Sequence, residues 1–325
     1  YFTEKMSETD ASAPLEELAQ TVGSAIDRFN ALLELSGTIS PYIYAFVSTN
    51  SRNALAMKKL SEFEQVGVRM QNLNTRFIAW VGKLAPVLEA VIGENESAKT
   101  HAFALNEAAK QSKYLMSAAE ESLAAELNVS GANAWGKLQE TLASQLTVDF
   151  ELDGQTQKLP LSALINLRSH PDESVRHRAY ETEMAAMENL REPLAAAMNG
   201  IKGTVNAINQ RRGRKDALHP AIDMARIDRP TLEAMLSAMA DSFPVFRRYF
   251  KAKAKRLGKE KLAWWDICAP VGESNKKYSW DEAQAFILTQ FGKFSPDLAA
   301  FAQRAFENNW IDAEQRDGKR GGAFC

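Results

Sequence analysis

The sequence predicts a mainly α-helical protein, and three observations carry this prediction. Across most of the 325 residues, apolar side chains recur at spacings of three and four, which is the period of one helix face. Only one stretch, near residues 146–159, alternates apolar and polar side chains as a strand does. Near the end, glycine stands at positions 318, 321 and 322, which favours an extended C-terminal segment in place of a helix.

Composition limits the classes of protein to be considered. Hydrophobic residues make up 45% of the chain and the formal net charge is −2. A chain of this length can form two domains, each with a sizeable core. The small net charge gives no global field to recruit nucleic acid, and no apolar run approaches the roughly 20 residues that span a bilayer. We therefore expect neither nucleic acid nor a membrane among the partners.

The two cysteines, Cys268 and Cys325, cannot form a disulfide framework. Free thiols are typical of a reducing compartment, and no basic-then-apolar signal segment is visible. These observations predict a cytoplasmic protein.

The first 145 residues are expected to form an N-terminal helical domain. Apolar residues from Leu15 to Leu33 share one helix face. Pro41 is expected to end this helix and to place the start of a second near residue 40, because proline disrupts a helix interior. Period and composition predict further helices over residues 60–84, 102–127 and 132–145.

Residues 146–159 are predicted to form a β-hairpin. Alternating side chains stand on both sides of Asp153-Gly154, a pair typical of a type I′ turn. Because an isolated hairpin is marginal in water, it must pack on helices. The change of period places a domain boundary here, between residues 1–145 and residues 146–325.

Helices are expected to resume after the hairpin, because helix-start signals recur along the rest of the chain. Proline in a first turn, and Ser followed three residues later by Glu, both favour a helix N-terminus. Such signals stand at Pro171, Asp228-Arg229-Pro230, Asp241–Pro244, Ser279 with Glu282, and Ser295-Pro296, the last opening a helix to about residue 308.

No catalytic or metal-binding group can be assigned from the residues alone. A helical zinc site needs two ligands at i and i+4, and no two histidines of the sequence have this spacing. His170 and His177 are expected to be surface or capping residues. The sequence contains no G-x-S-x-G, C-x-x-C or P-loop motif, and Cys325 is expected to be a packed thiol.

Two basic runs raise nucleic-acid binding as an alternative. One is Arg211–Lys215, and the other, Lys251–Lys261, follows Phe246, Tyr249 and Phe250. Basic residues among aromatics can bind single strands. The overall balance of charge favours a different interpretation, in which solvated helix faces cover an aromatic core stripe.

Four segments, in order along the chain, carry a resemblance to a known family: residues 171–181, 225–232, 249–270 and 309–325. They are similar to segments of oligoendopeptidase F-like members of the thimet-oligopeptidase family of zinc metallopeptidases. The resemblance implies a two-lobed, multi-helical protein with a deep channel that admits unstructured oligopeptides. In that family the last segment precedes H-E-x-x-H, which this sequence lacks.

The resemblance implies that residues 146–325 are the first part of a catalytic domain, truncated before the zinc motif. Zinc is therefore expected in the intact protein and none is expected to be bound by this chain, which also carries no catalytic residue. The implied partners are an oligopeptide substrate and the missing C-terminal catalytic half.

The resemblance also gives a role to the glycine-rich end of the chain. Gly321, Gly322, Ala323 and Phe324 are expected to bind substrate as an edge strand, a mode that tolerates many side-chain sequences. The leading hypothesis is thus the N-terminal part of a zinc-dependent oligoendopeptidase, inactive alone. The alternative is a non-catalytic helical interaction protein on the same scaffold.

Overall fold

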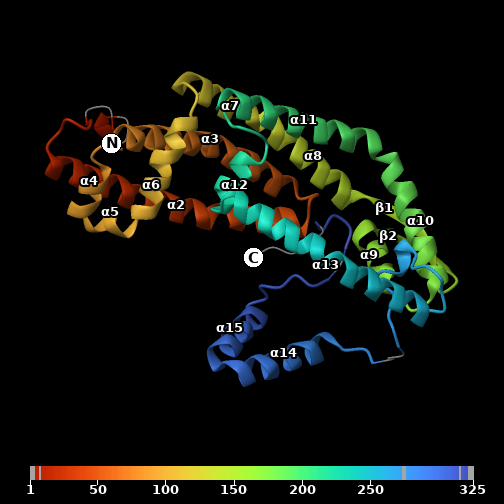
Figure 1. Cartoon of the computed structure of the whole chain (residues 1–325). Coiled ribbons are helices and arrows are strands. Elements are labelled where there is room, and N and C mark those ends of the chain that lie inside the picture. Colours follow the sequence, from red (N-terminus) through yellow and green to blue (C-terminus); the bar gives the residue numbers. More distant parts are fainter. Residues whose placement is uncertain (1–3, 7–8, 273–275, 315, 321–325) are drawn as a thin grey trace. The chain divides into compact units, whose positions relative to one another are not determined.

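The structure, a computed structural model, describes residues 4–6, 9–272, 276–314 and 316–320. Helices dominate these ranges, with a single two-stranded sheet among them (Figure 1). The prediction of a mainly α-helical protein with a small hairpin is confirmed. The chain divides into two compact units, each built from two segments: Tyr1–Ala143 with Asn189–Ala240, and Ser144–Glu188 with Asp241–Cys325.

The regular secondary structure in the described part of the first unit is all helical. Its helices, or those that begin in it, are α2 (Leu15–Thr49), α3 (Ala54–Lys83), α4 (Leu88–Glu94), α5 (Glu96–Thr100), α6 (Ala102–Gln111), α7 (Ala118–Ser130), α8 (Ala132–Gln145), α11 (Arg191–Arg211), α12 (His219–Ala225) and α13 (Arg229–Arg256). A short 3-10 turn, η1 (Ser112–Tyr114), follows α6.

The core of the first unit forms where α2, α3, α4 and α6 meet. Leu18 and Val22 of α2 pack with Trp80 and Val81 of α3, and all four side chains are buried. The indole N–H of Trp80 donates a hydrogen bond of 2.9 Å to the carbonyl oxygen of Thr9, so the polar atom of this large side chain is satisfied.

The helix break expected at Pro41 is wrong, because α2 runs without interruption from Leu15 to Thr49. A proline inside a helix removes one hydrogen bond and costs about 3 kcal/mol or more. Buried side chains of α2 on both sides of Pro41, such as Ile26 and Val47, offset that cost.

The helix start expected at 241–244 is also wrong, because α13 runs without interruption from Arg229 to Arg256. Pro244 lies inside α13, and strong helix formers such as Met239 and Ala240 precede it. A local helix-start signal in the sequence does not show whether a helix has already begun upstream.

The second unit begins with the predicted hairpin. Strand β1 (Thr147–Leu152) pairs antiparallel with β2 (Gln155–Pro160), and Leu152 lies opposite Gln155. Asp153 and Gly154 have φ values of 53° and 77°, the left-handed pair that a type I′ turn requires. The hairpin prediction is confirmed.

The hairpin packs on helices of its own unit, as an isolated hairpin must. Phe150 of β1 is buried in one cluster with Leu164 of α9 (Leu161–Asn166), and with Val175 and Ala179 of α10 (Glu173–Asn189). A short 3-10 turn, η2 (Leu167–Ser169), joins these two helices.

The second unit continues through a 3-10 turn, η3 (Trp264–Asp266), to α14 (Trp280–Phe294) and α15 (Pro296–Glu307). Ser279 and Glu282 form the predicted capping box, and the Ser295 hydroxyl accepts a hydrogen bond from the N–H of Leu298. Beyond α15, residues 310–314 and 316–320 are neither helix nor strand. None of the helices in the described ranges is long and apolar enough to cross a membrane.

Candidate functional site

The predicted substrate-binding residues Gly321, Gly322, Ala323 and Phe324 lie outside the described residues, so their role stays a prediction. The chain that leads to them, residues 309–320, is described except for residue 315. We call residues 309–320 the approach segment.

The approach segment begins with a sharp turn at the end of α15. Asn309 adopts a left-handed conformation, with φ 52°, which asparagine tolerates better than most residues. Its N–H bonds the carbonyl oxygen of Phe306 at 3.2 Å, and the N–H of Trp310 bonds that of Ala305 at 2.9 Å. This pair of bonds is a Schellman motif, which satisfies the last carbonyls of the helix and directs the chain away from it.

Ionic contacts hold the next part of the approach segment in one loop. The carboxylate of Asp312 accepts two hydrogen bonds from the guanidinium of Arg316, at 2.7 and 2.8 Å. The ammonium of Lys319 donates to the carbonyl oxygens of Asp312 and Glu314, at 2.5 and 2.8 Å. Gly318, with φ 79°, supplies the left-handed turn that brings Lys319 back.

These contacts also change the acid–base properties of the loop. The hydrogen bond from Arg316 outweighs the partial burial of Asp312, and with the nearby charge of Lys319 it lowers the pKa of the Asp312 carboxyl. The same hydrogen bond raises the pKa of the Arg316 guanidinium. The pair therefore stays ionised at neutral pH, and the loop keeps its closure.

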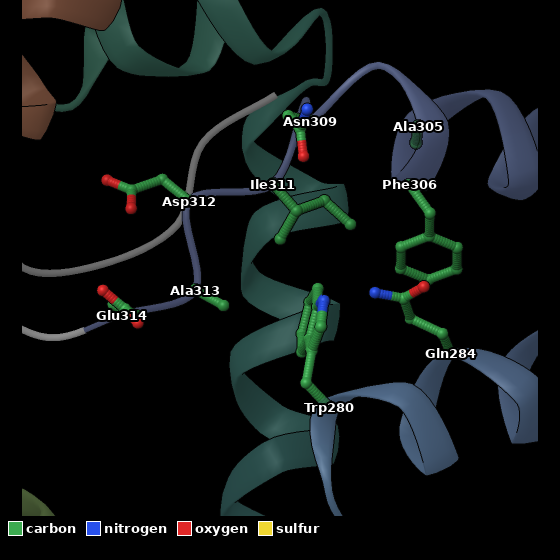
Figure 2. A pocket seen from close by; sticks show the side chains of 9 residues that line it. All are labelled: Trp280, Gln284, Ala305, Phe306, Asn309, Ile311, Asp312, Ala313 and Glu314. Carbon is green, nitrogen blue, oxygen red and sulfur yellow. The ribbon is translucent and has the colours of Figure 1, made fainter.

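A pocket of about 450 Å³ lies between the approach segment and the α14–α15 hairpin. Its apolar wall is formed by Trp280, Phe306 and Ile311, and the rings of Trp280 and Phe306 meet edge to face with centroids 6.0 Å apart. Figure 2 shows that the carboxylates of Asp312 and Glu314 point away from this wall. The pocket can receive an apolar side chain.

A buried ionic network fixes the segment that follows α13. The guanidinium of Arg176 donates to Asp266 at 2.8 and 3.3 Å, and also to the carbonyl oxygens of His170 and Pro171. Lys259 bonds Asp266 from the other side. Asp266 is fully buried, yet its charge is compensated on both sides, so the network ties residues 259–266 to the N-terminal turn of α10.

Burial alone would raise the pKa of the Asp266 carboxyl. The hydrogen bonds and positive charges of Lys259 and Arg176 outweigh that effect and hold the pKa below its usual range. The network joins two of the segments that carry the family resemblance. The sequence gives no sign of it, because its members are far apart in the chain and follow no short motif.

The histidines do not form a cluster. The imidazole of His177 stacks on the indole of Trp265, with centroids 4.1 Å apart, and lies 3.5 Å from the carboxylate of Glu181. His170 accepts a hydrogen bond from the N–H of Asp172, just before the start of α10, and the helix itself is capped by Asp172, whose carboxylate accepts from the N–H of Ser174. In the parts of the chain that the structure describes, no group of three or more His, Cys, Asp or Glu side chains is arranged to hold a metal ion.

The arginines of the first basic run form ion pairs with acidic side chains of their own unit. Arg212 forms two hydrogen bonds with Glu121, at 2.9 and 2.6 Å, and Arg211 bonds Glu120 at 2.9 Å. Arg214 pairs with Asp223. These cations are already neutralised, which weakens the nucleic-acid alternative.

The structure of the second basic run contradicts the expected aromatic core stripe. Lys253 is buried and donates to the carbonyl oxygen of Ile267, while Lys259 belongs to the ionic network. Phe246 and Tyr249 of α13 are more than half exposed, so they form no core stripe beneath the run. Few residues of this part of α13 are buried within the described chain, and packing, not helical period, decides what is covered.

Two family models match successive parts of this chain. The family model described as "Peptidase family M3" matches residues 166–325, and the one described as "Oligopeptidase F" matches residues 85–147. Oligopeptidase PepF of Bacillus subtilis is 22% identical over 241 residues, which cover 73% of this chain and 36% of PepF. Group B oligopeptidase PepB of Streptococcus agalactiae is 25% identical over 174 residues, covering 53% of this chain and 28% of PepB.

Solved structures share the fold. A protein of Bacillus anthracis assigned as an oligoendopeptidase F superposes with a TM-score of 0.74 at 19% identity, over 100% of this chain and 57% of the other. Oligoendopeptidase F of Enterococcus faecium gives a TM-score of 0.70 at 16% identity, over 95% and 59%. The matches thus span about a third of the curated relatives and somewhat over half of the solved chains.

Proposed function

The chain belongs to peptidase family M3, among the oligoendopeptidase F-like members, and on that premise we propose that it is the substrate-holding part of a zinc-dependent oligoendopeptidase. The proposed substrates are short, unstructured peptides. The observation that carries the proposal is the family match over residues 166–325, which includes the whole approach segment.

In this proposal residues 1–145 are an N-terminal helical domain, and residues 146–325 are the first part of the catalytic domain. Zinc is proposed for the intact protein on the basis of the match to peptidase family M3. When bound, zinc would supply an activated water for attack on the peptide carbonyl.

The role of this chain is to hold and orient the peptide. The Schellman turn at Asn309 and the Asp312–Arg316 clamp limit the freedom of the approach segment. Less conformational entropy is then lost when residues 321–324 pair with an extended peptide through backbone N–H and C=O groups. Such pairing aligns the peptide with little demand on its side chains.

We also propose a cytoplasmic location, because Cys268 is a free thiol and the sequence offers no disulfide framework. The alternative, a non-catalytic interaction protein on the same scaffold, makes a different prediction about hydrolysis.

The test measures cleavage of a quenched fluorescent peptide by two proteins, the full product of the natural gene and residues 1–325 alone. The proposal expects the full product to cleave the peptide, to lose activity with a zinc chelator, and to leave folded proteins intact. Residues 1–325 alone should not cleave. Chelator-sensitive cleavage by residues 1–325, or a full product without any peptidase activity, would reject the proposal; the second result would favour the interaction protein.

A further inference from the structure

A pocket of about 440 Å³ in the first unit is lined by residues of α6, the η1 turn and the end of α12, and we call it the α6–α12 pocket. Its volume falls in the range of about 300–1,000 Å³ that is typical of small-molecule sites. The two helices meet through a hydrogen bond between Gln111 and Asp223, which stand 112 positions apart in the chain. The α6–α12 pocket shares no lining residue with the approach segment.

The acidic side chains of the α6–α12 pocket already have partners within the chain. Glu107 bonds the ammonium of Lys110 at 2.6 Å. The carboxylate of Asp223 accepts hydrogen bonds from the amide of Gln111, at 3.1 Å, and from the guanidinium of Arg214. Because both negative charges are compensated by these contacts, neither carboxylate calls for a basic ligand.

The cations Lys113 and Arg226 line the same pocket and differ in this respect. Within the part of the chain that the structure describes, neither side chain forms an ion pair with a carboxylate. The guanidinium carbon of Arg226 lies 4.9 Å from the ring centroid of Phe103 instead. The pocket therefore has uncompensated positive charge beside an aromatic ring.

The backbone conformation of Arg226 is one that glycine would adopt more readily. Arg226 has φ 55° and ends α12 in the left-handed region, where glycine is the usual residue. Its N–H bonds the carbonyl oxygen of Asp223 at 3.0 Å, and the N–H of Ile227 bonds that of Ile222 at 3.3 Å. These two backbone bonds would form equally well with glycine, so the end of the helix does not account for an arginine at this position.

Tyr114 gives the pocket an aromatic wall that is held from two sides. The guanidinium carbon of Arg214 lies 4.1 Å from the ring centroid of Tyr114, and the imidazole of His219 meets that ring edge to face, with centroids 5.0 Å apart. A ring fixed in advance loses little entropy when a ligand packs on it. An aromatic wall beside unpaired cations suits a ligand that joins a planar apolar body to an anionic group.

We propose that the α6–α12 pocket binds a small organic carboxylate with an aromatic body. Arg226 and Lys113 donate charge-assisted hydrogen bonds to the carboxylate oxygens, and the ring of Tyr114 packs on the aromatic body. A monoanion fits better than a dianion such as a phosphate, because Glu107 and Asp223 also line the pocket and would repel the second charge. This inference goes beyond the proposed function and does not rest on it.

The test is isothermal titration calorimetry of naphthoate with the full product of the natural gene, treated with a chelator so that the carboxylate has no metal ion to bind. Arg226→Gly removes the guanidinium and suits the left-handed backbone, so this variant is expected to fold. Lys113→Gln removes the other cation. Lys58→Gln is the control, because Lys58 lies on α3 outside the pocket and its side chain is 70% exposed. The unfolding midpoint of every variant is measured alongside.

The unsubstituted protein is expected to bind naphthoate saturably. Arg226→Gly and Lys113→Gln should each weaken binding about fivefold or more at an unchanged unfolding midpoint, and Lys58→Gln should leave the affinity unchanged. No binding, or equal affinities in all variants, would overturn the inference.

Two further ligands test the chemistry of recognition. Equal affinity for neutral naphthamide would show that the anionic group is not recognised, and tighter binding of naphthyl phosphate would assign the pocket to a dianion. Both results contradict the proposal. Peptide hydrolysis plays no part in these titrations, so failure of the proposed function and failure of this inference are distinguished.

Discussion

Arg176 and Asp266 stand ninety residues apart in the chain and are joined by two hydrogen bonds, of 2.8 and 3.3 Å, between side chains that are almost completely buried. The pair fixes the η3 turn against the start of α10. Lys259 and Glu173 extend the network to the surface. Several consequences of this arrangement can be measured.

Removing the carboxylate charge should destabilise the protein strongly. Asp266→Asn leaves Arg176 buried and Lys259 without its main partner, and breaking a buried pair from one side costs about 3–5 kcal/mol. Urea unfolding measures the loss. Asp149→Asn, on the exposed side of β1, is the matched control and should change the free energy of unfolding by less than about 0.5 kcal/mol. Similar losses for both variants would contradict the structural role of the network.

The same carboxyl should make stability sensitive to acid. Its pKa is lowered in the folded state, so its contribution is complete above the unfolded pKa of about 3.9 and is lost as the pH falls through the folded value. Urea unfolding between pH 6 and pH 3, a window of about three units around that value, should show falling stability below about pH 4. In Asp266→Asn the fall should be smaller, and an unchanged pH dependence would refute the assignment.

The clamp in the approach segment should matter more for substrate binding than for stability. Asp312→Ala removes the bidentate pair with Arg316, and an exposed pair contributes only about 0.2–1 kcal/mol to folding. In the proposed intact peptidase the freed segment should raise KM about fivefold, the equivalent of ~1 kcal/mol of lost preorganisation. Glu62→Gln breaks the exposed pair with Lys59 on α3 and is the control. If the two variants have the same KM, the approach segment does not preorganise the site.

The basic runs should not bind nucleic acid. Arg211, Arg212 and Arg214 are paired with carboxylates, so few counterions would be released on contact with phosphates. A labelled single-stranded oligonucleotide should show no gel shift with this chain at low salt. Tight binding that weakens steeply with added salt would reverse this conclusion.

Local patterns predicted the local structure of this chain well. Asp153-Gly154 between alternating residues specified the hairpin, and Ser279 with Glu282 specified a helix start, because each signal acts through hydrogen bonds a few residues away. The helix boundaries predicted at Pro41 and Pro244 were wrong, because both prolines lie inside long helices whose stability outweighs the local helix-breaking tendency. The predicted binding residues 321–324 came from family resemblance and lie beyond the described chain.

Local sequence patterns could not predict contacts between residues that are far apart in the chain. The Arg176–Asp266 pair links positions ninety apart, and a single sequence contains no periodicity that would join them. The exposure of Phe246 was also missed, because the period of a helix shows which residues share a face but not what covers that face.

The central claim, that this chain holds the peptide through the backbone of residues 321–324, is tested most directly by steady-state peptide hydrolysis with Gly322→Pro in the intact protein. Proline removes the backbone N–H, and a lost hydrogen bond of about 0.5–1.5 kcal/mol, together with the altered backbone, should lower kcat/KM about tenfold. Zinc content and the unfolding midpoint should stay unchanged. An unchanged kcat/KM would contradict the claim.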